Sequence, residues 1–271
     1  EQGLEIELVE NAGSSITSQL IGQGEFSIGI VASEVAMIAK SKGVPLKVVS
    51  VIDKVSYAGI SCHKDANVNS AEDLIGKKVG VTITSNTYQQ YLAFIASEGI
   101  DQDSIEEVPI GGAGTEFFAG DLDCHALMPG ITESLAELKG VEVDTINYYD
   151  EGLEMYGQTL VANENFLEEN PELIQKVVTA ITKGMEFEKE NPEAAFEIML
   201  NHNPDLTNVE YERLLFEARM SYDLKLDNDI DPADGIQSEE MWEETKSILE
   251  ELGMLENDII LSEFYTNEFV I

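Results

Sequence analysis

Short apolar segments alternate with helix-like segments along the first fifth of the chain, and few folds accommodate this alternation. Residues 4–9 alternate acidic and apolar side chains, which is typical of a half-buried strand. Residues 26–31 predict a second strand, and the nearly continuous apolar run at 44–52 predicts a third that is buried on both faces. Helices are predicted between these strands, at 13–22 and 33–42. This β–α–β–α–β order favours a parallel sheet covered by helices.

The same pattern starts again after this first unit. Helical patterns separate most of the strands in the second series. The predicted strands of this series are 57–63, 78–82, 107–110, 123–128 and 141–146. This stretch therefore predicts a second α/β unit with the size of a small domain.

The sequence from residue 170 to residue 252 is mostly helical in pattern. Asn-Pro-Glu occurs at 170–172 and again at 191–193. Proline is tolerated at the first position of a helix because the amide there has no intrahelical partner, and the following glutamate favours the positive end of the helix dipole. Apolar residues then recur at three- and four-residue spacing, so both motifs predict the start of an amphipathic helix.

The net charge of −38 is the most unusual property of the composition. A surface of this sign repels nucleic acid and anionic lipid, so neither is an expected partner. It suits either an acidic extracytoplasmic protein or a halophilic protein whose self-repulsion is screened by salt. No apolar run is long enough to cross a bilayer and no signal peptide is recognisable. We therefore expect membrane association only through a lipid anchor outside this chain.

Two cysteines are each followed by a histidine, in the pairs Cys62-His63 and Cys124-His125. Neighbouring residues of a strand point to opposite faces, so one such pair cannot easily hold a single zinc ion. No metal site is therefore expected. The two cysteines can form a disulfide in an oxidising compartment or remain buried thiols, and the sequence leaves both alternatives open.

Several motifs follow one another in an order that is specific to a family. Val-Ala-Asn-Glu-Asn-Phe-Leu-Glu-Glu-Asn-Pro-Glu-Leu at 161–173 and Asn-Pro-Glu-Ala-Ala at 191–195 carry the strongest signal. Leu-Ile-Gly-Lys-Lys-Val-Gly-Val at 74–81, Phe-Ala-Gly-Asp-Leu-Asp at 118–123 and Phe-Tyr-Thr-Asn-Glu-Phe at 264–269 support it. The chain resembles the solute-binding proteins of ABC importers for thiamine-pyrimidine precursors, alkanesulfonates, taurine and nitrate. The thiamine-pyrimidine branch is the most similar of these.

This resemblance implies an α/β, two-lobe periplasmic-binding-protein-like fold of type II, with a ligand cleft between the lobes. Lobe 1 would comprise 1–56 and 157–271, and lobe 2 would comprise 57–156. The usual first strand and helix of the family are not present in the chain. The resemblance also implies a small-molecule ligand, an ABC transporter permease as partner, an extracytoplasmic location and no cofactor.

Candidate ligand contacts follow from a general rule about α/β sheets, in which ligands bind beyond the carboxyl ends of strands and at helix N-termini. Tyrosines near the two proposed lobe crossings add planar surfaces on which a ring can stack. The same serines, threonines and asparagine also cap helices without any ligand, and the tyrosines also serve packing. The candidates are Ser14, Ser15, Ser33, Tyr57, Ser85, Asn86, Thr87, Gly112, Glu133, Tyr149 and Tyr156.

Charge favours one class of ligand over another. The only arginines, Arg213 and Arg219, fall in a predicted helix away from every candidate loop. An uncharged or cationic heteroaromatic such as a pyrimidine precursor of thiamine therefore suits the chain better than a sulfonate, taurine or nitrate. No nucleophile or acid–base constellation is recognisable, so we expect no enzymatic activity. A pyrimidine-synthase-like enzyme and a sensory module are the less favoured alternatives.

Overall fold

In the computed structural model the chain forms two compact units. The described residues are 3–9, 13–83, 85–111, 114–204, 206–223 and 234–270. Unit 1 comprises Glu1–Ser56, Glu154–Ala195 and Leu226–Ile271, and unit 2 comprises Tyr57–Leu153 and Phe196–Lys225. No helix among the described residues is long and apolar enough to span a membrane.

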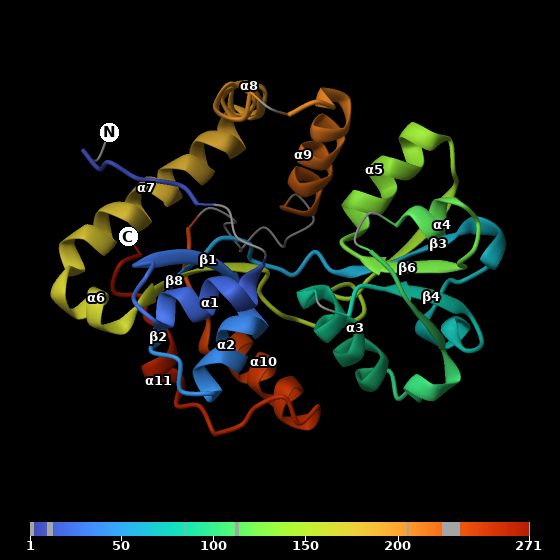
Figure 1. The fold of residues 1–271 in the computed structure, drawn as a ribbon, viewed down its shortest axis with the longest axis horizontal. Coiled ribbons are helices and arrows are strands. Elements are labelled where there is room, and N and C mark those ends of the chain that lie inside the picture. Colours follow the sequence, from blue (N-terminus) through green and yellow to red (C-terminus); the bar gives the residue numbers. More distant parts are fainter. Residues whose placement is uncertain are drawn as a thin grey trace. The chain divides into compact units, whose positions relative to one another are not determined.

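Unit 1 contains a three-stranded sheet in the order β1-β8-β2, with helices on both of its faces (Figure 1). Its strands are β1 (Ile28–Ala32), β2 (Leu46–Val51) and β8 (Gln158–Asn163). Its helices are α1 (Ser14–Gly22), α2 (Ser33–Ser41), α6 (Glu164–Glu169), α7 (Pro171–Glu190), α10 (Glu239–Glu251) and α11 (Leu261–Phe264).

The prediction of a parallel sheet in this unit is wrong. β1 and β2 run in the same direction, as the β–α–β pattern requires, but they are not neighbours. β8 lies between them and is antiparallel to both, with Ile30 opposite Leu160 and Val48 opposite Val161. The difference arises because β8 is supplied by a segment more than one hundred residues further along the chain, which local periodicity does not reveal.

The strand predicted at residues 4–9 is also absent. Residues 3–9 have no regular secondary structure, and the Leu8 side chain is 91% exposed. Leu4 alone of the predicted apolar face packs against a core, beside the residues that line α7. An alternating pattern becomes a strand only where a neighbouring strand accepts its hydrogen bonds, and no described strand lies beside this segment.

The unit 1 sheet separates two hydrophobic cores. The larger core includes Trp242 of α10, which is fully buried against Phe264 and Tyr156. The smaller core lies toward α7 and contains Ile174 and Val178. Asn-Pro-Glu begins α7 at Pro171 and α8 (Pro192–His202) at Pro192, so both helix starts predicted from this motif are confirmed.

Unit 2 contains a five-stranded mixed sheet in the order β5-β4-β6-β3-β7. β5, β4 and β6 are parallel, and β3 is antiparallel to β6 and β7. Helix α3 covers one face of the sheet, and α4 and α5 cover the other (Figure 1). The strands are β3 (Gly59–His63), β4 (Lys78–Val81), β5 (Glu106–Pro109), β6 (Cys124–Leu127) and β7 (Val143–Asn147). The helices are α3 (Asn86–Ser97), α4 (Thr115–Phe118), α5 (Pro129–Lys139) and α9 (Val209–Asp223), with short 3₁₀ turns at Lys64–Ala66, Ala71–Leu74 and Gln102–Ser104.

The contacts of α9 give unit 2 a different extent from that of the predicted lobe 2. α9 packs against α5, and Phe196–Lys225 therefore groups with unit 2. The sequence-based prediction instead places all of 157–271 in lobe 1. Residues 154–156 group with unit 1. The lobe boundaries and the ligand cleft between the lobes stay a prediction.

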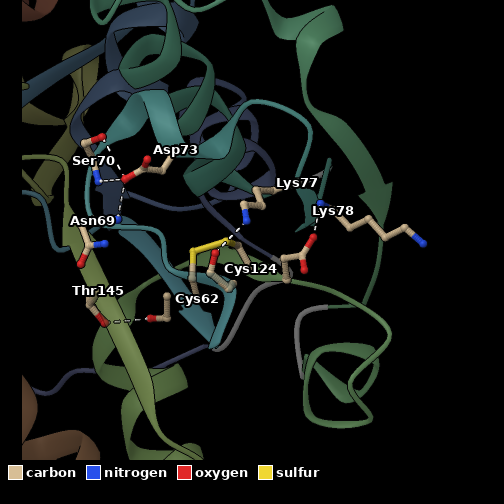
Figure 2. The surroundings of a disulfide bond; sticks show 11 residues. Cys62, Asn69, Ser70, Asp73, Lys77, Lys78, Cys124 and Thr145 are labelled. Carbon is tan, nitrogen blue, oxygen red and sulfur yellow. Dashed lines mark hydrogen bonds between the residues drawn. A yellow bond between two sulfur atoms is a disulfide. The ribbon is translucent and has the colours of Figure 1, made fainter. Parts of the chain in front are cut away.

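Cys62 and Cys124 form a disulfide across β3 and β6 (Figure 2). The two residues lie directly opposite each other in the antiparallel pair, and both are buried. This arrangement decides between the two alternatives that the sequence leaves open. His63 and His125 follow the cysteines and therefore project from the opposite face of the sheet, toward α4 and α5.

Candidate functional site

The candidate site of unit 2 lies at one end of its sheet. β4, β5, β6 and β7 all finish at this end, and β3 begins there. The chain passes from β4 to β5 on one side and then crosses β4 to reach β6, so the strand order reverses between β4 and β6. Ligands of open α/β sheets bind at such a reversal, beyond the carboxyl ends of the strands. The candidates that follow or precede a strand at this end are Tyr57, Ser85, Asn86, Thr87, Glu133 and Tyr149.

The start of α3 gathers hydroxyl groups just after β4. The Ser85 hydroxyl donates to the Thr82 carbonyl at 2.7 Å and lies 2.8 Å from the Thr87 hydroxyl. Ser85 therefore gives α3 no side-chain cap, even though it occupies the N-cap position. Asn86 is half-buried and Thr87 is buried. The first turn of α3 thus presents backbone amides and hydroxyl groups, which suit a polar ligand atom.

The start of α5 lies at the same end of the sheet, just after β6. Glu133 is half-buried in the second turn of α5. Its neighbour Thr132 is buried, and the Thr132 hydroxyl lies 3.2 Å from Nδ1 of His125. Gly112, predicted in the loop after β5, lies outside the described residues.

The tyrosines at this end of unit 2 differ in exposure. Tyr57 is buried, with 9% of its surface exposed, and Tyr149 is half-buried. Tyr148 is buried and stacks on Phe94 of α3, with 4.4 Å between the ring centroids. Burial raises the pKa of the Tyr148 hydroxyl well above its usual range. Tyr149 is therefore the most exposed of these three tyrosines.

The candidate residues of unit 1 meet at the carboxyl end of β1. The Ser14 hydroxyl accepts a hydrogen bond from the Ala32 amide at 3.0 Å, and Ser15 beside it is exposed. The Ser33 hydroxyl donates to the Tyr156 carbonyl at 2.6 Å. The structure thus brings Ser14, Ser33 and Tyr156 to one place, although each makes an internal hydrogen bond there.

Tyr156 is held by the protein itself. Its hydroxyl accepts a hydrogen bond from the Ser238 amide at 2.7 Å, and its ring meets Trp242 edge-on with 5.1 Å between centroids. Burial raises the pKa of Tyr156 to about 12, partly opposed by the Ser238 hydrogen bond. These contacts give the side chain a packing role, and its function as a stacking surface for a ligand stays a prediction.

Sequence reasoning missed three charged residues at the same end of unit 1. Glu34 is fully buried in the first turn of α2, next to Ser33. Asp53 follows β2, and its carboxylate accepts from the Gln158 amide at 3.2 Å. Lys54 is buried, forms an ion pair with Asp234 and donates to the Ile236 carbonyl at 2.6 Å. The strand-end rule applied to 51–54 would have found two of them.

No group of histidine, cysteine, aspartate and glutamate side chains suited to a metal ion occurs among the residues that the structure describes. The two histidines beside the cysteines do not belong to such a group. Nε2 of His63 lies 2.8 Å from the Phe117 carbonyl, and the His63 ring stacks on the Phe117 ring. The His125 ring is buried nearby.

Comparison with known protein families gives a match over residues 1–195 to the family described as NMT1/THI5 like. The chain belongs to the NMT1/THI5-like family. The predicted resemblance is therefore confirmed. A relative from Legionella pneumophila named 4-amino-5-hydroxymethyl-2-methylpyrimidine phosphate synthase is 23% identical, over 100% of this chain and 84% of that protein. A relative from Halalkalibacterium halodurans named formylaminopyrimidine-binding protein is 24% identical, over 98% of this chain and 82% of that protein.

Solved structures support the predicted fold. The periplasmic aliphatic sulphonate binding protein SsuA from Escherichia coli is similar with a TM-score of 0.75 and 16% sequence identity. The likeness covers 96% of this chain and 87% of that one. The NMT1/THI5-like chain therefore has the α/β fold of periplasmic binding proteins, as the sequence predicts.

The prediction that the chain is not an enzyme is contradicted by these comparisons. Several relatives of this NMT1/THI5-like chain, from bacteria and fungi, are named pyrimidine phosphate synthases at 22–25% identity. The prediction depended on the lack of a recognisable catalytic constellation in the sequence. The relatives of this chain thus include proteins named as synthases as well as proteins named for binding.

Proposed function

We propose that the chain binds a small heteroaromatic ligand of the pyrimidine type and delivers it to the permease of an ABC importer. The observation that carries this proposal is the arrangement at the carboxyl end of the unit 2 sheet. The starts of α3 and α5 lie beyond β4 and β6, where the strand order reverses. Hydroxyls, backbone amides and the half-buried Glu133 at this end match the donors and acceptors of an aminopyrimidine.

The names of the relatives support a pyrimidine over an oxyanion. A binding protein and a synthase of the family both have a pyrimidine in their names. SsuA, named for sulphonates, shares only 16% identity and supports the fold alone. Both arginines of this chain lie in α9, and the net charge of −38 repels anions at long range. A sulfonate, taurine or nitrate ligand is the alternative that the test below can reveal.

Each unit has its own set of proposed contacts. In unit 2 they are Ser85, Asn86, Thr87 and Glu133, with Tyr57 and Tyr149 offering ring surfaces and Gly112 the loop after β5. In unit 1 they are Ser14, Ser15 and Ser33, with Tyr156 behind them. Glu133 would accept hydrogen bonds from the exocyclic amino group of the ring, a charge-assisted contact that is stronger than a neutral one.

We also propose an extracytoplasmic location. The buried disulfide between Cys62 and Cys124 supports it, because such bonds persist in oxidising compartments and are rare in the cytosol. This support is independent of the family and of the relatives' names.

Calorimetric titration with 4-amino-5-hydroxymethyl-2-methylpyrimidine, taurine and nitrate tests the proposed ligand class. We expect binding of the pyrimidine alone, weakened about tenfold or more by Glu133→Gln, because a hydrogen bond to a charged group is lost. Glu137→Gln, one turn further along α5 and exposed, is the matched control and should bind like the wild type. Binding of taurine or nitrate without the pyrimidine would overturn the proposal.

A synthase is the second candidate function, favoured by the names of several relatives. Mass spectrometry of the purified protein separates the two candidates. Formation of a pyrimidine phosphate by the protein would establish the synthase. Bound pyrimidine, together with no formation of a pyrimidine phosphate by the protein, supports the binding function.

A further inference from the structure

The side chain of His125 lies where several segments of unit 2 meet. His125 lies in β6, opposite Ser61 of β3 and beside Gly80 of β4, and only 2% of its surface is exposed. Its Nδ1 lies 3.2 Å from the hydroxyl of Thr132 in α5. The sequence pattern does not predict a buried imidazole at the centre of this sheet.

Gly114, which directly precedes α4, lies against the same ring. Gly114 is the N-cap residue of α4 and has a φ of +61°, and a Cβ at this position would lie 2.8 Å from Cε1 and 2.9 Å from Nδ1 of His125. The Gly114 amide donates to the Gly111 carbonyl at 3.3 Å, and the Phe118 amide donates to the Gly114 carbonyl at 3.1 Å. The imidazole is therefore the surface against which Gly114 and the start of α4 are placed.

The imidazole also contacts the helix that contributes Glu133. Thr132 precedes Glu133 directly, and its hydroxyl bond to Nδ1 fixes the rotation of the second turn of α5 relative to β6. One ring thus contacts both Gly114, just before α4, and the start of α5, which carries Glu133 of the proposed ligand site.

We propose that His125 is a positioning residue, which holds Gly114 at the start of α4 and Thr132 at the start of α5 in register, the latter through its Nδ1 bond. This inference rests on the proposed ligand site of unit 2. The residue acts through its neighbours, since its ring is covered by them.

The polar character of the residue argues against simple packing. Nε2 is buried and has no hydrogen-bond partner among the described residues. An unsatisfied buried nitrogen destabilises a fold, so a phenylalanine would pack more favourably if volume were all that mattered. Burial holds the pKa of His125 down to about 4, against the opposing effect of the Glu116 carboxylate, so the ring is neutral at pH 7. A neutral ring can keep the Thr132 hydrogen bond in either tautomer.

Amide hydrogen exchange on the unliganded protein tests the positioning directly. The variants are His125→Phe, His125→Asn and Thr132→Val, because an asparagine amide can replace Nδ1 whereas phenylalanine cannot. We expect exchange at the Gly114, Phe118 and Ile131 amides to accelerate about tenfold in His125→Phe and Thr132→Val, as expected for one lost hydrogen bond. His125→Asn should restore exchange to near the wild-type rate. His202→Asn, at the exposed end of α8, controls for the loss of a histidine.

The affinity for 4-amino-5-hydroxymethyl-2-methylpyrimidine provides the second readout. We expect about tenfold weaker binding in His125→Phe and Thr132→Val, with recovery in His125→Asn. Unchanged exchange in the first two variants, faster exchange throughout unit 2, or an asparagine variant that behaves like phenylalanine would each overturn the role of His125. If the wild type does not bind the pyrimidine, the proposed function fails, and the exchange rates still decide whether His125 positions these segments.

Discussion

Removal of the disulfide should destabilise unit 2 by an amount that follows from the position of the two cysteines. The double substitution Cys62→Ala with Cys124→Ala deletes the bond without leaving a reactive thiol. The cysteines are 62 residues apart in the chain, and the cross-link limits the conformations of the unfolded segment between them. For a loop of this length the chain-entropy relation gives about 4 kcal/mol at 25 °C, at the upper end of the usual range of 2–4 kcal/mol.

Urea denaturation of the double variant and the wild type measures this effect. Far-ultraviolet circular dichroism reports both units, whereas Trp242, the single tryptophan, lies in unit 1. We expect the part of the circular dichroism transition that belongs to unit 2 to move to lower urea by about 1 M or more. The fluorescence transition of Trp242 should move less, since the cross-linked segment lies in unit 2.

Two controls accompany this measurement. Wild-type protein unfolded in the presence of a reducing agent should match the double variant, because it loses the same cross-link. Ser97→Ala, at the exposed end of α3, should leave both transitions in place. A double variant with the wild-type circular dichroism transition would refute the reasoning, as would a reduced wild type that unfolds like the oxidised one.

Three further predictions concern pH, a buried hydroxyl and salt. Because the pKa of His125 is about 4 in the folded protein and about 6.5 when unfolded, the unfolded state binds more protons between these values. The free energy of unfolding should therefore fall by up to about 3 kcal/mol from pH 7 to pH 4, and His125→Asn should remove this part of the slope in urea titrations. Tyr156→Phe leaves the Ser238 amide without its acceptor and should lower the stability of unit 1 by about 1–2 kcal/mol by Trp242 fluorescence, whereas Tyr211→Phe in α9 should not. Added sodium chloride should raise the melting temperature because it screens the repulsion within a chain of net charge −38, and a melting temperature that falls with salt would contradict this.

The sequence predicts the elements of this fold better than their pairing. Helices and strands such as α2 and β2 occur within a few residues of the ranges indicated by periodicity. The position of β8 between β1 and β2 depends on contacts between residues far apart in the chain, such as Val48 with Val161, which a local pattern does not contain. Residues 4–9 have the local pattern of a strand but form none, because an alternating pattern becomes a strand only beside another strand.

The candidate site shows the same division between local and distant information. Ser85–Thr87 and Ser33 follow strands directly, so a rule about strand ends finds them. The internal hydrogen bonds of Tyr156 with Ser33 and Ser238 depend on segments that meet only in the folded chain. The same is true of the ion pair between Lys54 and Asp234.

The two Cys-His dipeptides connect the stability of unit 2 with its proposed site. Because successive residues of a strand face opposite ways, the bond between Cys62 and Cys124 ties β3 to β6 from one face, while His63 and His125 serve the other. On that face His63 stacks on Phe117 of α4, and His125 contacts Thr132 of α5. The covalent bond therefore fixes the register that places His125 against Gly114 and α5. Reduction of the disulfide should consequently accelerate amide exchange at Gly114 and Ile131 as well as in the strands themselves. Faster exchange confined to β3 and β6 would show that the two faces are independent.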